Sequence, residues 1–120
     1  MSTEKLFEKY TLNNKVRVPN HLVIAPLTLF GSNPDEKISK EESEYLKQRA
    51  TNIALYIVGA TAVSQEGIAF ACQPRALSDK DIPSLSERAK IIKSQGALVI
   101  NQIHCISIKR TFRFGSFSSI

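Results

Sequence analysis

The sequence has few of the residues that build disulfide frameworks and metal centres. It contains two cysteines, Cys72 and Cys105, and only two histidines. The cysteines form neither a CxxC pair nor the dense framework that holds small secreted domains together. We therefore expect two reduced thiols and no metal site.

The sequence also lacks an apolar run long enough to cross a bilayer. Its longest mostly apolar stretch, residues 53–63, is well short of the roughly 20 residues that a membrane-spanning helix needs. The first residues, Met1 to Lys5, do not show the basic-then-apolar order of a secretory signal. These absences predict a cytoplasmic protein with no membrane partner.

Charge of one sign is also missing from most of the chain. The formal net charge is +5, from 16 basic and 11 acidic residues. Residues 105–120 hold three of the basic residues and no acidic one, so the first 104 residues are nearly balanced. A balanced surface is not the electrostatic footprint of a nucleic-acid-binding domain. We therefore do not expect a nucleic-acid partner.

The hydrophobic pattern up to residue 104 predicts strands that alternate with helices. Three short apolar runs show no polar alternation, as expected of strands buried on both faces; they are residues 21–25, 55–58 and 97–100. Before them, two short arms flank Asn13-Asn14-Lys15, which predicts a β-hairpin ending at Pro19.

Two pairs of residues predict where the helices begin. Ser39 with Glu42, and Ser84 with Glu87, have the spacing of a capping box, in which each side chain caps the other residue's backbone amide. They predict helices over residues 40–52 and 85–95, the second followed by Gly96 as a C-cap. This order favours parallel βαβ units, in a small open sheet or at the front of a larger barrel.

Small or polar residues follow each apolar run, where parallel α/β proteins carry their functional groups. They are Ala25-Pro26-Leu27-Thr28, Gly59-Ala60-Thr61 and Asn101-Gln102-Ile103-His104. Such residues could let a planar ligand lie against the backbone while Thr28 and Gln102 supply hydrogen bonds. They are also ordinary residues for ending a strand, so both interpretations stay open. Residues 60–83 form a long connection without periodicity, a length that is usually functional.

Three segments, in order and at the right spacing, resemble the NADH:flavin oxidoreductase/Old Yellow Enzyme family. They are residues 6–28, 57–67 and 96–104, each of which includes one of the strand ends above. The resemblance implies an α/β fold: an N-terminal β-hairpin and the first three βα units of a TIM (β/α)8 barrel, over residues 1–104. A whole barrel needs about 250 residues, so the likeness covers only its front.

The resemblance implies an FMN-dependent oxidoreductase. In this family NAD(P)H reduces the flavin, which passes a hydride to an electron-poor alkene or a similar small molecule. The implied FMN contacts are Ala25, Pro26 and Leu27 by backbone and packing, Thr28 near the O4/N5 edge, Ala60 by its backbone and Gln102 at the pyrimidine ring. Donors at these places would tune the flavin's potential. A homo-oligomer is left open for the full-length relative.

The resemblance stops after His104. The family continues with a further histidine and Ala-Gly-Arg, whereas Cys105-Ile106-Ser107 follows here. We interpret residues 105–120 as a non-family tail, as a frameshift would produce. The family's phosphate anchor and substrate-binding pair cannot be mapped, so we expect the isolated chain to bind FMN weakly or not at all, without turnover. An incomplete barrel also exposes an edge and apolar surface that favour aggregation.

Other residues allow both a functional and a packing interpretation. His104 is a candidate catalytic acid or a packed or loop histidine, and Phe30 could lie near substrate or pack its loop. Tyr45 and Tyr56 favour packing, and Cys72 favours an inert thiol over a redox role. Two other functions stay open: a small basic interaction module that uses the tail, and another FMN- or phosphate-binding barrel enzyme.

Overall fold

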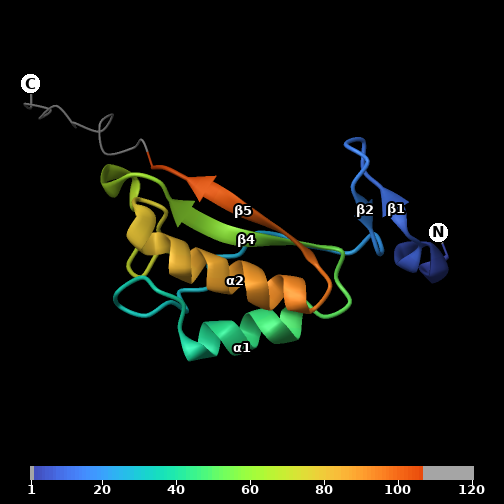
Figure 1. Ribbon diagram of the computed structural model, residues 1–120, viewed down its shortest axis with the longest axis horizontal. Coiled ribbons are helices and arrows are strands. Elements are labelled where there is room, and N and C mark those ends of the chain that lie inside the picture. Colours follow the sequence, from blue (N-terminus) through green and yellow to red (C-terminus); the bar gives the residue numbers. More distant parts are fainter. Residues whose placement is uncertain (1, 107–120) are drawn as a thin grey trace, which may run out of the picture.

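The computed structural model describes residues 2–106, which form a β-hairpin followed by an α/β unit (Figure 1). The unit is a three-stranded parallel sheet in the order β3–β4–β5, with α1 and α2 on one face. The predicted α/β class and parallel order are confirmed. In chain order the elements are η1 Thr3–Phe7, β1 Tyr10–Thr11, β2 Arg17–Val18, β3 Val23–Ile24, α1 Lys40–Arg49, β4 Leu55–Ala62, η2 Gln65–Gly67, η3 Asp79–Asp81, α2 Ile82–Ser94 and β5 Leu98–His104.

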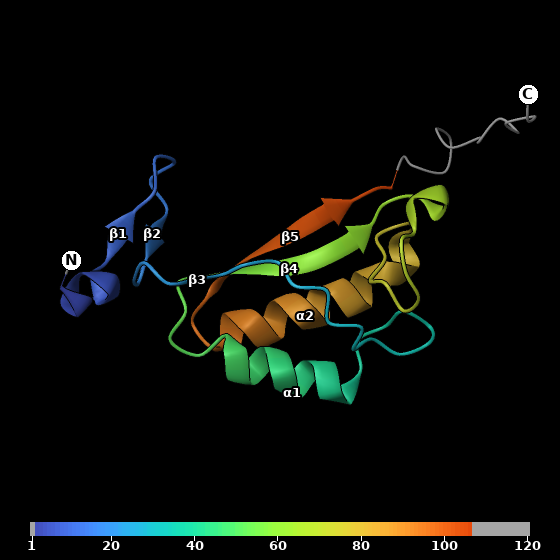
Figure 2. The same ribbon diagram turned by 180° about the vertical axis from the view of Figure 1, so that it is seen from behind.

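The hairpin forms where the turn residues predicted it. Tyr10 pairs with Val18 and Thr11 with Arg17, in antiparallel register. Lys15 closes the turn with a φ of 66°, which puts it in the left-handed region. Seen from behind, the hairpin lies beyond the amino ends of the parallel strands (Figure 2). It is therefore remote from the carboxyl edge of the sheet, where functional groups were expected.

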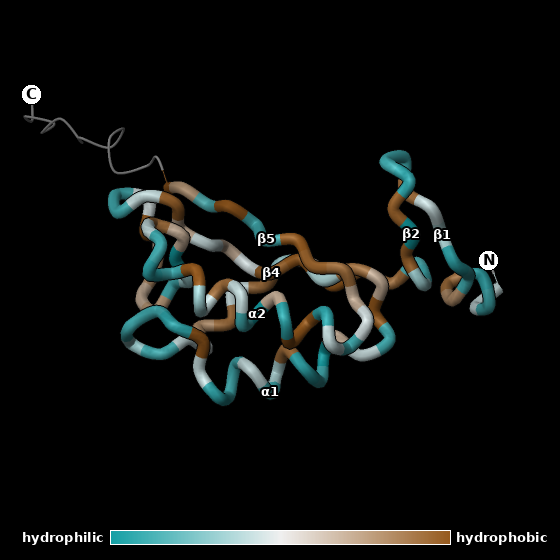
Figure 3. Tube along the Cα trace, viewed as in Figure 1, coloured by the Kyte–Doolittle hydropathy of each residue, from teal (hydrophilic) through white to brown (hydrophobic). Residues whose placement is uncertain are grey.

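The core lies between the sheet and the two helices. Its buried members come from both helices, from β4 and from the start of the β5 arm: Leu46, Ala50, Tyr56, Val58, Ile92 and Ala97. Apolar residues follow the strands, while the outer turns of α1 are polar (Figure 3). Burying each large side chain stabilises the fold by about 1.5–3 kcal/mol, so this single layer holds the sheet to its helices.

The prediction of strands buried on both faces is wrong for these residues. Val23 is 53% exposed and Ile100 is 50% exposed, because the helices cover only one face of the sheet. Strand boundaries also differ: β3 is shorter than predicted, whereas β4 runs to Ala62 and β5 to His104. β4 and β5 are both longer than predicted because they pair with each other, and the hydrogen-bonded ladder continues for as long as both backbones keep the strand conformation.

Only one of the two hydrogen bonds of the predicted capping box forms at the start of α1. The Ser39 hydroxyl accepts a hydrogen bond from the Glu42 amide at 2.9 Å, so the serine caps the helix. The Glu42 side chain does not return to the cap amide, because its carboxylate is bound by Arg88 and Ser32 instead. The helix ends at Arg49 rather than residue 52, where Asn52 already has a φ of 59°.

The predicted start of α2 is wrong by about one turn. The helix begins at Ile82, and the capping box belongs to Ser78 and Asp81 in the short turn before it. Pro83 lies in the first turn, where its missing N–H costs nothing because first-turn amides have no partner within the helix. Gly96, with a φ of 89°, follows the helix as predicted.

The connection after β4 is shorter than predicted and partly ordered by pairing. Ala62 forms a parallel bridge with Arg75, through hydrogen bonds with Pro74 and Ala76 at 2.8 Å. The segment that includes Pro74 and Arg75 therefore lies beside β4 where β3 has already ended. The turn of η2 and the segment that follows it return the chain to this point.

Candidate functional site

A β-bulge brings two of the predicted site residues together. The β4–β5 register passes from Val58 opposite Asn101 to Thr61 opposite Ile103. Two residues of β4, Gly59 and Ala60, therefore stand opposite a single residue of β5, Gln102. Bulges redirect side chains at sheet edges and next to active sites. Here the bulge places Ala60 beside Gln102 at the carboxyl edge of the sheet.

Gly59 allows the segment that follows β3 to approach Ala60 and Gln102. A Cβ on Gly59 would collide with the carbonyl oxygen of Leu27, so only glycine permits this approach of the two backbones. This contact places the backbone of Leu27 and Thr28 against the β-bulge of β4. Residues from all three strand ends, which are far apart in the sequence, are thus adjacent at one edge.

The predicted FMN contacts differ in how they lie at this edge. Leu27, Thr28 and Ala60 line one small pocket. Gln102 faces the bulge from β5 and does not line that pocket, and neither do Ala25 and Pro26, which precede it in the chain. Their exposure also differs, since Ala60 is buried, Pro26 is half-buried and the others are exposed: Ala25, Leu27, Thr28 and Gln102.

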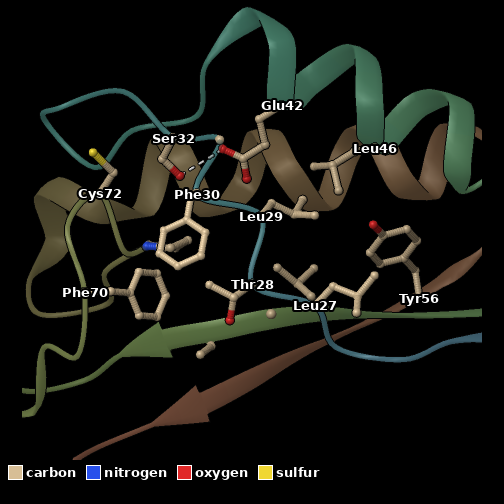
Figure 4. Close-up of a pocket in the computed structure, with 15 residues that line it drawn as sticks. Leu27, Thr28, Leu29, Phe30, Ser32, Glu42, Leu46, Tyr56, Phe70 and Cys72 are labelled. Carbon is tan, nitrogen blue, oxygen red and sulfur yellow. Dashed lines mark hydrogen bonds between the residues drawn. The ribbon is translucent and has the colours of Figure 1, made fainter.

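The pocket itself is small and aromatic. It holds about 30 Å³, which is the space of a single water molecule, far below the 300 Å³ or more of a typical ligand site. Phe30 and Phe70 meet edge to face over it, with ring centroids 5.1 Å apart (Figure 4). A flavin ring does not fit inside this pocket, so at this end of the sheet it would have to lie on the exposed surface beside Thr28 and Gln102.

Phe30 was expected at the lip of this loop, near substrate or in packing. It is 67% exposed with a φ of 50°, and its only aromatic partner among the described residues is Phe70. Phe70 was not singled out from the sequence, because a lone aromatic residue in an aperiodic connection gives no signal of where it lies.

His104 is a strand residue. It ends β5 opposite Ala62, whereas the sequence suggested that the strand stops at residue 100. Its ring is half-buried, and within the described residues its buried Nδ1 has no hydrogen-bond partner. The loop interpretation is wrong because the extension of β4 gives β5 a partner as far as His104; a catalytic role stays a prediction.

Tyr56 packs in the core, as expected. Burial raises the pKa of its phenol to about 12, with smaller contributions from the nearby Tyr45 and Glu42. A phenol with this pKa keeps its proton at neutral pH. Tyr45 also packs against the core, and Arg49 stacks over its ring at 5.5 Å.

Both cysteines are free thiols in the structure. Cys72 lines the pocket with a φ of 57°, and the Cys105 Sγ lies 3.6 Å from the Ser64 hydroxyl. Among residues 2–106, no three His, Cys, Asp or Glu side chains gather as metal ligands would. Within the same residues, no helix combines the length and apolarity needed to span a membrane.

The sequence interpretation missed a buried charged cluster behind the edge. Arg88 and Glu42 form an ion pair at 2.7 Å with side chains only 2% and 5% exposed. The capping-box spacing explained Glu42 as a cap, so its partner was not sought. A signal was available, since Arg88 shares a helix face with Ile92, which is fully buried.

Comparison with known proteins identifies the family. The model of the NADH:flavin oxidoreductase / NADH oxidase family matches residues 5–112. The chain belongs to this family. The matched range passes His104, and the boundary that we placed at residues 104–105 stays a prediction. The predictions of a basic or frameshifted tail concern residues 105–120, of which residues 107–120 lie outside the described part of the chain.

Curated members of this flavin oxidoreductase family cover most of the chain. The probable NADH-dependent flavin oxidoreductase YqiG of Bacillus subtilis is 36% identical over 99 residues, which are 82% of this chain and 27% of the relative. The NADH:fumarate oxidoreductase of Klebsiella pneumoniae is 32% identical over 86% of this chain and 11% of its own length. The chain thus spans about a quarter or less of these relatives.

Solved structures give the same fold. The Old Yellow Enzyme homologue of Zymomonas mobilis is 26% identical with a TM-score of 0.75, covering 85% of this chain and 28% of its own. The Old Yellow Enzyme of Pichia sp. AKU4542 is 22% identical with a TM-score of 0.76, and the match covers 85% of this chain and 26% of that enzyme. At this identity it supports the fold alone. The described α/β unit is therefore similar to a part of an Old Yellow Enzyme TIM barrel.

Proposed function

We propose that the whole protein is an FMN-dependent oxidoreductase, with NAD(P)H as reductant and an electron-poor alkene or a similar small molecule as acceptor. This chain would supply the hairpin and the first three βα units of its barrel. The observation that carries the proposal is the meeting of the three strand ends at Gly59. The names of the relatives, which include NADH-dependent flavin and fumarate oxidoreductases, support the reaction class.

The residues at the edge fit the ring system of a flavin. FMN, when bound, would supply the hydride chemistry of the family. The Thr28 hydroxyl and the Gln102 carboxamide are exposed hydrogen-bond donors on neighbouring segments, and both can bind ring oxygens and nitrogens. Ala60 and Leu27 would present backbone and small apolar surface to the ring. Such fixed donors stabilise charge that develops on a bound ring.

For the isolated chain we expect FMN binding that is weak or absent, and no turnover. Leu27, the most apolar of the predicted contacts, is 54% exposed, so the edge offers one side of a site rather than an enclosed cavity. A tight cofactor site encloses most of its ligand. The cytoplasmic location predicted from the sequence stays a prediction.

A titration with two flavins tests the site. FMN and lumiflavin, which has the same ring without the ribityl phosphate, should bind the purified chain with similar affinity if only the ring edge is present. Thr28→Ala and Gln102→Ala should each weaken both by about three- to tenfold, the value of one hydrogen bond. Thr11→Ala in the hairpin and Gln48→Ala on α1 are matched controls far from the edge. Fluorescence quenching measures the affinity.

The outcomes separate the parts of the proposal. If Thr28→Ala and Gln102→Ala leave the flavin affinity unchanged, the flavin binds elsewhere and the proposed site is contradicted. FMN binding at least tenfold tighter than lumiflavin would reveal a phosphate anchor in this chain. Oxidation of NADH with an alkene acceptor would contradict the expected lack of turnover. No binding to a folded sample would mean that the edge is not sufficient by itself.

A further inference from the structure

Three buried polar side chains, Glu42, Ser84 and Arg88, form a cluster with the half-buried Ser32 directly behind the edge. We call it the Glu42 cluster. The Arg88 Nε donates to Glu42 Oε1 at 2.7 Å and its Nη2 donates to Glu42 Oε2 at 3.0 Å. The other bonds join the serines: Arg88 Nη1 donates to Ser84 Oγ at 2.8 Å, Arg88 Nη2 to Ser32 Oγ at 3.0 Å, and Ser32 Oγ to Glu42 Oε2 at 3.0 Å.

The Glu42 cluster joins three pieces of chain. Glu42 comes from α1, Ser84 and Arg88 from α2, and Ser32 from the connection between β3 and α1. That connection receives a second bond, since the Ser39 hydroxyl donates to the carbonyl of Gly31. A buried ion pair often adds little net stability compared with apolar residues of similar volume. Its directional bonds can instead select one geometry of the groups that it contacts.

The opposite end of the same connection is fixed independently. The Leu27 carbonyl rests on Gly59, and the Leu29 side chain packs against the core. Thr28 and Phe30 lie between these fixed points and are exposed, with Thr28 directed toward β4 and Phe30 toward Phe70 (Figure 4). Residues 27–32 are therefore held at both ends, with the proposed cofactor contact in the middle.

We propose that the Glu42 cluster is a positioning device for residues 27–32. Through Ser32 it holds this segment in one conformation and so fixes the direction of the Thr28 hydroxyl at the flavin edge. The contact between Thr28 and a flavin rests on the proposed function. The way in which residues 27–32 are held rests only on the geometry above. Glu42 and Arg88 act through Ser32 and do not touch the cofactor.

Ser32→Ala is the sharpest test, because it removes the contact with the segment and leaves the buried ion pair in place. Backbone amide order parameters at residues 28–31, measured by NMR, should fall from about 0.85, typical of a rigid backbone, toward 0.6. Ser94→Ala removes a similar hydroxyl bond, to the Ile91 carbonyl, at the far end of α2, and should leave the segment rigid. Ser32→Thr keeps the hydroxyl and should restore the order.

Flavin binding provides a second readout. Ser32→Ala should weaken lumiflavin binding and shift its bound absorbance spectrum as Thr28→Ala does, and the double variant should be no worse than Thr28→Ala alone. Glu42→Gln should act in the same direction where circular dichroism shows that it folds. Unchanged order parameters in folded Ser32→Ala, or additive losses in the double variant, would overturn the positioning role. If the wild-type chain binds no flavin, the edge is not sufficient by itself, and the order parameters alone decide the positioning role.

Discussion

At the scale of single residues, Gly59 leaves less room for a Cβ than any other glycine of residues 2–106. Neither its backbone angles nor a turn demands glycine; the neighbouring Leu27 carbonyl does, because it occupies the place of a side chain. Gly31 makes a useful contrast, since a Cβ there would meet Glu42 Cβ at 3.6 Å, an ordinary contact. Gly31 belongs to the connection between β3 and α1, whereas Gly59 lies in β4 and contacts that connection at Leu27.

Gly59→Ala should therefore destabilise the chain by about 2–4 kcal/mol, the range for overpacking combined with a backbone shift. The same shift would move Thr28 away from the bulge. Gly31→Ala should change the stability by less than about 1 kcal/mol. Urea unfolding measures both, and equal stabilities of the two variants would contradict the close approach.

Tyr56 provides a prediction about pH. Because burial raises the pKa of its phenol from 10.0 to about 12, the folded chain keeps this proton at a pH where the unfolded chain has lost it. The folded state thus binds more protons between pH 10 and 12, and stability falls as the pH rises through that window. The contribution of Tyr56 is complete below pH 10 and is lost progressively as the pH rises from 10 to about 12.

Wild type should lose about 2 kcal/mol relative to Tyr56→Phe between about pH 9 and about pH 11.5, as measured by denaturant unfolding at each pH. The variant should also lack the last step of the tyrosinate absorbance titration. An identical pH dependence of the two proteins would mean that the phenol is not held neutral by burial.

At the scale of elements, β5 is the least covered part of the sheet. Val99 packs against the core, so its neighbours Leu98 and Ile100 point to the face without helices. Ile100 and Ile103 are 50% and 69% exposed, and in residues 2–106 β5 pairs only with β4. An unpaired edge next to exposed isoleucines is a site for association between copies of a chain.

Replacing both isoleucines by threonine should reduce self-association without loss of folding, since threonine keeps the preference for strands. Light scattering over a range of concentrations would show the change. Ile92→Thr is the matched control, because Ile92 is fully buried and its replacement should unfold the chain rather than keep it monomeric. Unchanged scattering of the double variant would exclude β5 as the cause of association.

At the scale of the whole molecule, the described residues form a single core layer between the sheet and the two helices. The candidate site lies at the carboxyl ends of the strands. The helices and β4 make a packed unit, while the exposed face and edge of the sheet carry the residues that we propose to contact the flavin. The chain spans 28% of the Old Yellow Enzyme homologue that it resembles. The same arrangement explains both the open cofactor edge and the exposed apolar residues.

The sequence by itself determined the class and order of the elements, the hairpin and the family, because these depend on local periodicity, on turn residues and on three short motifs. It placed α2 a turn late, because Ser84 has the spacing of a cap although the helix begins at Ile82. Only the tertiary structure decided that Gly59 admits Leu27, that a bulge sets Ala60 beside Gln102, and that Glu42 binds Arg88 rather than its own cap amide. These facts depend on contacts between distant parts of the chain, and such contacts leave no local pattern in the sequence.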